Sequence, residues 1–358
     1  MTGLRAFVVR FVALCAAVVP PAVAVPPAAA VPPGWSALPV PAAAPPVSVS
    51  GLAARGPREA WASGFEQHTG GGTRPMLYRW DGTAWSRDTT FPGAGEPGRL
   101  GRVHFAGDET WIFRGREGTG DILRRGSAGD WSTLRLPQSL WTYQDFDATP
   151  DGAAWVVGED DGGLKVLHHD GTSWTAQDTP EDVLYVMGIT ARTATDAWAW
   201  ADTIDGATVL HWDGTAWRDA RVPLPPDSNV HTIVVDGPGH ITVGGSRYVD
   251  GRPRTYLTTR DGAIWRTTYP PLGDTSAQAV VRGPDGALWL PVRSDRAFRS
   301  KYARLHGART TFSYGPARTD AIEVEPRALT AAGSSLLSFG TVEIYGSKPN
   351  LMSERLGG

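Results

Sequence analysis

The sequence has very little sulfur, few lysines and no imbalance of charge. Cys15 is the single cysteine in 358 residues, and it lies within an apolar N-terminal run. Loss of that run would leave no thiol, which excludes disulfides and thiolate chemistry. With 34 basic and 37 acidic residues the net charge is −3, so nothing in the composition favours binding to nucleic acid or to an anionic membrane.

Long apolar runs and short catalytic motifs are also missing. The apolar run near the N-terminus is too short to span a bilayer, and no later segment is longer. The sequence contains no His-Glu-x-x-His, no Gly-x-Ser-x-Gly, no phosphate loop and no dinucleotide fingerprint. We therefore expect no membrane span and no bound cofactor.

The first 24 residues have the pattern of a secretory signal. Arg5 and Arg10 precede an apolar stretch over residues 11–19, and small residues lead to a cleavage site after Ala24, with an alternative site after Ala30. We expect a secreted, extracellular protein whose residues 25–358 form a single domain.

Two tryptophan signatures alternate along the rest of the chain. One is Asp-Gly-Thr-Ala-Trp or a close variant, and the other is a Trp followed by a Gly three residues later. The first, extended by spacing, occupies positions 35, 85, 131, 174, 217, 265 and 312. The second occupies positions 61, 111, 155, 198, 241, 289 and 337. Both series have seven members, at intervals typical of one four-stranded blade.

These repeats predict an all-β fold: a seven-bladed β-propeller with four antiparallel strands per blade. The first signature begins at Trp35, before any repeat of its own, while the chain stops where the seventh repeat needs its outer strand. We therefore expect residues 35–40 to supply that strand, because an incomplete blade would expose an unpaired edge. The eleven tryptophans in the two series are expected to pack between blades.

The Asp-Gly pairs predict the hairpins between third and fourth strands. Asp-Gly favours a two-residue type I′ loop, in which both central residues have positive φ. Such loops would place Trp85 opposite Tyr78 and Trp217 opposite Leu210.

The Asp-Gly-Thr-Ala-Trp repeats resemble those of secreted actinobacterial β-propeller repeat proteins, which are related in pattern to Asp-box, Kelch and WD-repeat propellers. The resemblance covers nearly the whole chain after the signal. Asp and Gly are adjacent here, whereas an Asp box separates them, and the Gly-His and Trp-Asp pairs of WD repeats do not recur. The resemblance implies the fold and little about activity.

One position in each blade is expected to converge on the mouth of the central channel. Ten residues before the inner signature, the seven blades carry four small residues and three polar ones, Asp145, His231 and Arg327. These three are candidates for acid, base and anion clamp, or for channel residues that only contact water.

The rim loops supply candidates for ligand binding. Trp141 and Tyr143 could stack on a sugar or fill a gap between blades. The arginines of two loops could bind uronate or phosphate groups, or be solvated: Arg247, Tyr248 and Arg254 in one, and Arg293, Arg296 and Arg299 in the other. Asp160 and Asp161 are weak candidates for a cation, since they lack the spacing of a calcium loop.

Two functions remain open from the sequence. The first is a secreted, monomeric scaffold that binds an extracellular glycan or protein, because the repeated residues serve the fold. The alternative is a lyase or hydrolase with its site at the channel mouth.

Overall fold

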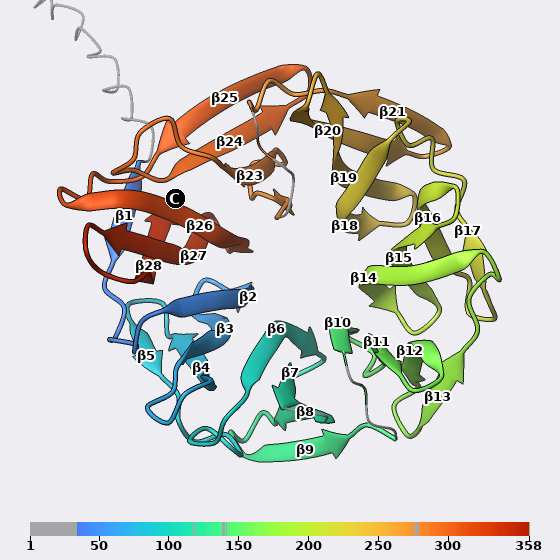
Figure 1. Ribbon diagram of the computed structural model, residues 1–358, viewed down its shortest axis with the longest axis horizontal. Coiled ribbons are helices and arrows are strands. Elements are labelled where there is room, and N and C mark those ends of the chain that lie inside the picture. Colours follow the sequence, from blue (N-terminus) through green and yellow to red (C-terminus); the bar gives the residue numbers. More distant parts are fainter. Residues whose placement is uncertain are drawn as a thin grey trace, which may run out of the picture. The chain divides into compact units, whose positions relative to one another are not determined.

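The computed structural model describes residues 34–116, 119–137, 140, 142–273, 275 and 279–357. The predicted signal and both cleavage sites lie outside these residues. The described part contains seven four-stranded antiparallel sheets, arranged as a ring around a central channel (Figure 1). It contains no helix long and apolar enough to cross a membrane.

The first three blades follow the chain in order, from the channel outwards. Blade 1 contains β2 (Val47–Gly56), β3 (Glu59–Gln67), β4 (Thr73–Trp80) and β5 (Trp85–Arg87). Blade 2 contains β6 (Arg99–Ala106), β7 (Glu109–Arg116), β8 (Thr119–Arg125) and β9 (Trp131–Arg135). Blade 3 contains β10 (Thr142–Ala148), β11 (Ala154–Asp160), β12 (Gly163–His169) and β13 (Trp174–Gln177).

The next three blades repeat this order. Blade 4 contains β14 (Val183–Thr193), β15 (Asp196–Thr203), β16 (Gly206–Trp212) and β17 (Trp217–Asp219). Blade 5 contains β18 (Ser228–Gly237), β19 (His240–Val249), β20 (Arg252–Asp261) and β21 (Ile264–Thr268). Blade 6 contains β22 (Val281–Arg282), β23 (Leu288–Val292), β24 (Lys301–His306) and β25 (Arg309–Tyr314).

Blade 7 joins the two ends of the described chain. It contains β26 (Ala321–Ala332), β27 (Ser335–Ile344), β28 (Asn350–Leu356) and, as its outer strand, β1 (Trp35–Leu38). β1 pairs antiparallel with β28, so that Trp35 lies opposite Leu356 and Leu38 opposite Ser353. This confirms the predicted closure, with a strand two residues shorter than expected.

β1 and the residues that follow it contact both neighbouring blades. The Trp35 ring stacks on Tyr302 of blade 6 at 3.8 Å, and its Nε1 donates to Ser313 Oγ at 2.9 Å. Towards blade 1, the Tyr78 hydroxyl donates to the Pro41 carbonyl at 3.0 Å. The closing segment therefore holds blades 6, 7 and 1 together.

The core of the protein lies between the blades. Buried apolar side chains of the described residues form seven clusters, one at each interface between neighbouring blades. All eleven tryptophans of the two repeat series belong to these clusters, which confirms their predicted packing role. Second strands such as β3 are buried on both faces, because each face contacts another blade.

The predicted two-residue loops are wrong at three of the Asp-Gly repeats. Trp80 pairs with Trp85, His169 with Trp174, and Trp212 with Trp217, which leaves a four-residue loop in each case. Asp81 Oδ1 accepts hydrogen bonds from the Thr83 and Ala84 amides and the Thr83 hydroxyl. These bonds favour the longer loop and lower the pKa of Asp81 to about 2. A two-residue Asp-Gly loop with positive φ does occur, between β19 and β20 at Asp250 and Gly251.

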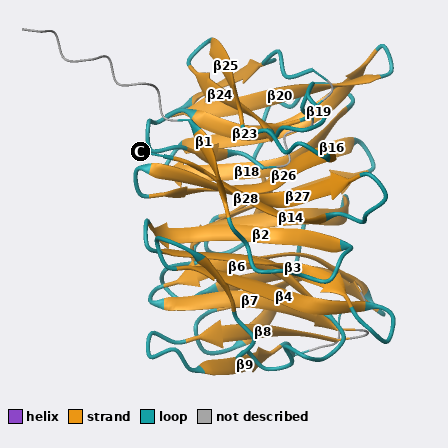
Figure 2. Cartoon of the chain, turned by 90° about the vertical axis from the view of Figure 1, so that its left-hand side faces the viewer, coloured by secondary structure: helices purple, strands orange, loops and turns teal. Residues whose placement is uncertain are grey.

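Seen from the side, the strands run across the ring and the loops lie on its two faces (Figure 2). Because each blade is an antiparallel meander, its second-to-third strand loop and its connection to the next blade lie on one face, here called the mouth face. The loops between first and second and between third and fourth strands lie on the opposite face, here called the turn face.

We predict that Trp35→Ala destabilises the ring by about 3–5 kcal/mol, since it removes a buried aromatic side chain together with its stacking partner contact. Urea unfolding of the chain from residue 34 onwards measures this change. Ser36→Ala, on the exposed side of the same strand, should stay within about 0.5 kcal/mol of the unmodified protein. Equal stability of all three proteins would contradict the role given to the closing strand.

Candidate functional site

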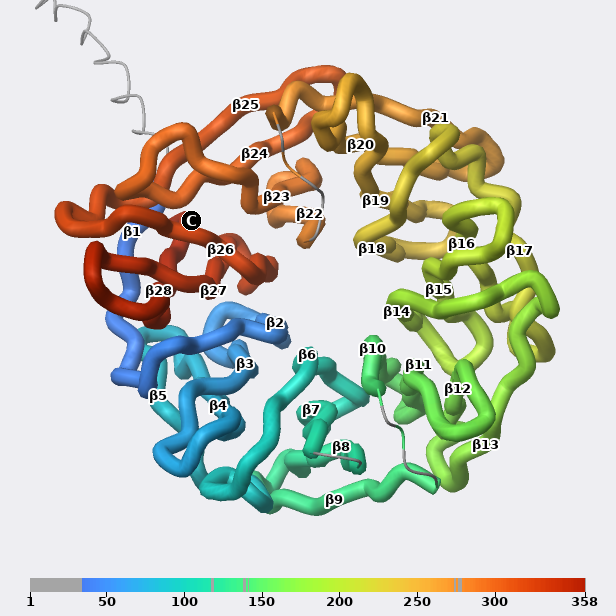
Figure 3. Tube along the Cα trace, viewed as in Figure 1, coloured from blue at the N-terminus to red at the C-terminus, as the bar shows by residue number. Residues whose placement is uncertain are grey.

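A β-bulge in the innermost strands brings side chains to the channel. Pairing of the first with the second strand skips one residue in blades 4, 5 and 7, at Met187, His231 and Arg327. Figure 3 shows the innermost strands around the channel. A bulge residue leaves the ladder, so its side chain is aimed away from the sheet.

In blades 5 and 7 a glycine of the second strand accommodates this bulge. Gly340 pairs beside the bulge of blade 7, and a Cβ there would come within 2.1 Å of the Glu325 carbonyl oxygen. Gly245 has the same relation to the Asn229 carbonyl oxygen in blade 5, also at 2.1 Å. Blade 4 bulges opposite Ala201 and Trp200, so the glycine permits a closer approach of the inner strand but is not required for the bulge.

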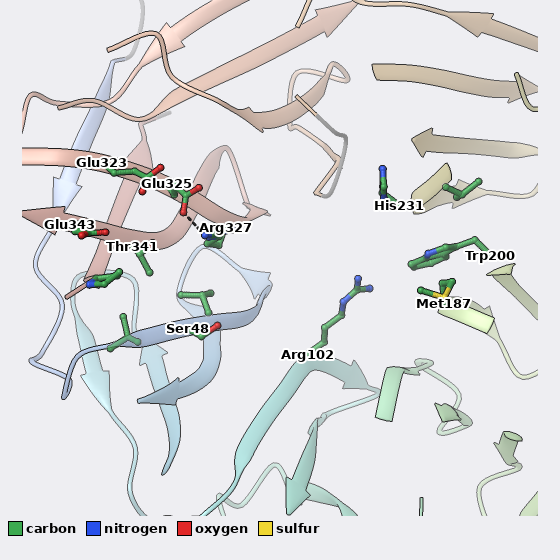
Figure 4. Close-up of a pocket in the computed structure, with 14 residues that line it drawn as sticks. Ser48, Arg102, Met187, Trp200, His231, Glu323, Glu325, Arg327, Thr341 and Glu343 are labelled. Atoms are coloured by element: carbon green, nitrogen blue, oxygen red, sulfur yellow. Dashed lines mark hydrogen bonds and ion pairs between the residues drawn. The ribbon is translucent and has the colours of Figure 1, made fainter. Parts of the chain in front are cut away.

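The bulge residues line a cavity of about 700 Å³ at the channel mouth (Figure 4). Its lining comes from five blades, 1, 2, 4, 5 and 7: Val47, Ser48, Val49, Arg102, Met187, Trp200, Val230, His231, Glu323, Glu325, Arg327, Thr341, Glu343 and Pro349. In Figure 4 the glutamates and Arg327 lie on one side of the channel, with His231, Trp200 and Met187 on the other. The volume is within the range of small-molecule and side-chain binding sites.

His231 and Arg327, two of the three channel candidates, both line this cavity. His231 Nε2 is 2.8 Å from Ser246 Oγ, and burial lowers the pKa of the imidazole below its ordinary value of 6.5. His231 is therefore neutral at pH 7. Arg327 forms an ion pair with Glu325 two residues away on β26.

Asp145, the third candidate, does not join them. Its side chain is buried, lies 3.3 Å from Arg102 Nη1 and accepts a hydrogen bond from the Ile189 amide at 3.1 Å. Burial raises the pKa of its carboxyl, against the opposing effect of Arg102. Asp145 thus connects blade 3 to blades 2 and 4 instead of lining the cavity, because its position in β10 lies beside the bulge and not in it.

The small residues expected to frame the channel instead accommodate neighbouring side chains. A Cβ at Gly188 would lie 1.9 Å from Trp200 Cζ2, so the glycine provides the space for the indole. In the same way, Gly101 lies against the Tyr143 hydroxyl. Trp200 consequently reaches the cavity although only 5% of it is exposed.

Sequence reasoning missed several lining residues: Arg102, Met187, Trp200, Glu323, Glu325 and Glu343. Trp200 had a signal, since it lies outside both repeat series. Arg102 and Met187 each lie one residue from the aligned channel position. The glutamates had no signal, because their charges are spread over two strands.

Of the two aromatic candidates of the rim, only Tyr143 lies among the described residues. Trp141 lies outside the described residues. Tyr143 stacks on Phe113 at 3.5 Å between blades 2 and 3, and burial raises the pKa of its hydroxyl well above the ordinary value. Tyr143 therefore fills the gap between blades, the second of the two roles considered for it.

The arginine candidates lie on the mouth face of blades 5 and 6. Arg247 is directly opposite Arg254 across β19 and β20, and Tyr248 beside them is 61% exposed. Arg293 and Arg296 line a second cavity of about 640 Å³, which shares Glu323, Glu325 and Arg327 with the first. Among the described residues, no carboxylate forms an ion pair with Arg247, Arg254, Arg293, Arg296 or Arg299.

Of the acidic candidates, Asp160 is the last residue of β11 and Asp161 lies in the turn to β12. Asp160 lies 3.3 Å from Lys165 Nζ and accepts a hydrogen bond from the Gly162 amide at 2.8 Å, while the neighbouring Asp161 is exposed. Within the part of the chain that the structure describes, no three His, Cys, Asp or Glu side chains are grouped as metal ligands.

Comparison with known proteins supports the fold alone. No family model matches the chain, and no curated protein matches its sequence. The fold is similar to that of a streptogramin B lyase, with a TM-score of 0.61 and 12% identity over 90% of this chain and 97% of the other. It is also similar to virginiamycin B lyase from Staphylococcus aureus, with a TM-score of 0.57 and 13% identity over 86% and 95%. The third similar structure is that of the WD40 repeats of RRP9, with a TM-score of 0.58 and 11% identity over 91% of this chain and 99% of the other.

These similarities place the chain among the β-propellers. Propellers of this shape include both lyases and WD40 repeat proteins. Identities near these values carry no information on a functional site.

We predict that Asp145→Ala lowers the free energy of unfolding by about 1–3 kcal/mol, because it leaves the Ile189 amide and Arg102 without their acceptor. Chemical denaturation measures this loss. Asp161→Ala removes an exposed carboxylate and should change stability by no more than about 0.5 kcal/mol. An Asp145→Ala protein as stable as the Asp161→Ala protein would show that Asp145 does not link the blades.

We predict a pH-dependent contribution from His231. Burial lowers the pKa of His231 in the folded protein, so the unfolded chain binds the proton more tightly. The neutral imidazole therefore makes its full contribution to the free energy of unfolding above about pH 6.5, and this contribution is lost as the pH falls. The unmodified protein should therefore lose more free energy of unfolding between pH 7 and pH 5 than His231→Gln does. Parallel pH profiles of the two proteins in urea unfolding would contradict the lowered pKa.

Proposed function

We propose that this protein is an exported binding scaffold whose ligand, an extracellular glycan or protein, docks on the mouth face. The observation that carries this proposal is the distribution of exposed apolar side chains. Of the twelve large hydrophobic residues exposed in the part of the chain that the structure describes, ten lie on the mouth face: Leu184, Tyr185, Met187, Ile204, Tyr248, Tyr269, Phe298, Ile322, Ile344 and Tyr345. They form an arc over blades 4 to 7, here called the apolar arc.

This concentration is unusual for a surface that only contacts water. Isolated exposed hydrophobic side chains are common, but a gathering of them on one face marks an interaction surface. The turn face carries only Ile264 of the same twelve, at the start of β21. The apolar arc surrounds one side of the cavity, which Met187 joins to it.

Binding is preferred over catalysis because of the position of the carboxylate. A lyase or hydrolase at the channel mouth would need acid and base within reach of one substrate. His231 and Arg327 line the cavity, but Asp145 is held between blades by Arg102 and the Ile189 amide. Glu325 is paired with Arg327, and the other two carboxylates of the cavity, Glu323 and Glu343, lie across the channel from His231 (Figure 4).

The proposal predicts that Ile204→Ser, Tyr248→Ser and Tyr345→Ser together weaken ligand binding by at least about tenfold. Loss of three exposed apolar contacts removes hydrophobic burial on docking, while the fold should keep its stability. The measurement uses glycan arrays and individually purified extracellular proteins, each binder being titrated by calorimetry.

The matched control is Ile264→Ser on the turn face, which removes one exposed apolar side chain from the other side of the ring. Binding should survive in this variant. A ligand that is lost with Ile264→Ser and kept by the triple variant would place docking on the wrong face and refute the proposal.

A further inference from the structure

The cavity has two carboxylates that the protein itself does not neutralise. Glu323 and Glu343 lie directly opposite each other on β26 and β27, and both line the cavity. Directly opposed residues of an antiparallel pair point to the same side, so like charges there destabilise the sheet. The described residues include no cation within ion-pair distance of either carboxylate.

The cations of the cavity are engaged elsewhere. Arg102 pairs with the buried Asp145, and Arg327 pairs with Glu325. His231 is neutral, with Ser246 as its hydrogen-bond partner. The charge that remains in this cavity is negative and lies on the blade 7 side of the channel, where Figure 4 labels Glu323 and Glu343. Arg293 and Arg296 line the second cavity together with Glu323, but neither forms an ion pair with it.

On the other side of the cavity, the indole N–H of Trp200 lacks a hydrogen-bond acceptor among the described residues. Trp200 is only 5% exposed and lines the cavity. Its Nε1 is not fully buried, unlike that of Trp155 or Trp217, so it is open to an acceptor from outside the protein. This donor, facing the cavity, favours a ligand with a carbonyl or hydroxyl oxygen.

We propose that the cavity binds a basic side chain, lysine or arginine, of a partner protein that docks on the apolar arc. The cationic group lies against Glu323 and Glu343, and Trp200 Nε1 donates to an oxygen of the inserted segment. This inference rests on the proposed binding function and specifies its partner.

The surroundings favour a protein partner over a glycan. The aromatic half of the apolar arc, which includes Tyr248 and Tyr345, suits either kind of ligand. The aliphatic members Leu184, Ile204, Ile322 and Ile344 offer no plane for a sugar ring but pack against apolar side chains of a protein, and they favour a protein partner. The unpaired arginines of blades 5 and 6, such as the opposed Arg247 and Arg254, complement acidic residues beside the inserted base.

The two opposed pairs have opposite sign and lie on one face. Glu323 and Glu343 belong to blade 7, and Arg247 and Arg254 to blade 5. Each pair costs stability in the free protein, and a partner with the complementary charges would relieve both. Such a surface also selects one orientation of the partner, because reversal would bring like charges together.

The experiment uses the chain from residue 34 onwards and a phage-displayed library of random twelve-residue peptides. The most enriched peptide is then synthesised together with a version in which its basic residues are replaced by glutamine, and both are titrated. Peptides containing lysine or arginine among apolar residues should be enriched. Replacement of the bases should weaken binding by about 10- to 100-fold.

Two variants of the protein test the contacts. E323Q/E343Q keeps the shape of the cavity and removes its charge, and should weaken the peptide by about 10- to 100-fold. Trp200→Phe keeps an aromatic ring and removes the N–H, and should weaken it by about 3- to 10-fold. D108N/D130N removes two exposed charges from the turn face and should bind as the unmodified protein does, which controls for general attraction.

The inference is overturned if the library yields no peptide or only peptides without basic residues, or if E323Q/E343Q binds as tightly as D108N/D130N. A glycan ligand that is unaffected by E323Q/E343Q would overturn it as well. In these cases the triple variant of the apolar arc distinguishes the two proposals. If that variant no longer binds a ligand that the unmodified protein binds, the mouth face is still the docking surface and only the inserted basic side chain is refuted. Unchanged binding in that variant would refute the proposed function too.

Discussion

The pairing of β1 with β28 is the constraint on which the rest of the molecule depends. Every other blade is built from four consecutive strands, but blade 7 needs a strand from the other end of the described chain. Without it, β28 would present an open edge and the apolar cluster around Trp35 and Tyr302 would lose one wall. The cavity takes residues from five blades, including blade 7 and blade 1 on either side of the closure, so its geometry exists only while the ring is closed.

The same repeat that builds the scaffold also shapes the site. In blades 5 and 7 a glycine opposite the inner strand allows a carbonyl of that strand to approach beside the bulge. Since the residue at the bulge does not take part in the ladder, its identity is free to vary among blades. Met187, His231 and Arg327 occupy this position in three blades. The propeller thus keeps its sheets uniform while each blade contributes a different side chain to the channel.

Charged side chains are paired between the blades but partly unpaired on the mouth face. Between blades, buried carboxylates are satisfied: Asp145 has Arg102 and a backbone amide, and Glu354 has Ser300, Tyr302 and Arg318. At the mouth face, opposed glutamates and opposed arginines remain without counterions among the described residues. Buried charges need such partners, whereas Glu323 and Arg254 are exposed and stay charged in contact with water.

The repeats by themselves determined the fold class, the blade number, the closing strand and the packing role of eleven tryptophans. They could do so because blade architecture is set by local periodicity, and each repeat carries the same signal. The hairpins at Asp81 and Asp213 were predicted wrongly, since the Asp side chain competes for the loop amides in a way that the dipeptide alone does not reveal. Only the tertiary structure decided that His231 and Arg327 share a cavity while Asp145 does not, and that Trp200, Glu323 and Glu343 belong to it. The physical reason is that a shift of one residue along a bulged strand decides whether a side chain faces the channel or is buried between blades. In addition, Glu323 and Glu343 become neighbours only when β26 pairs with β27.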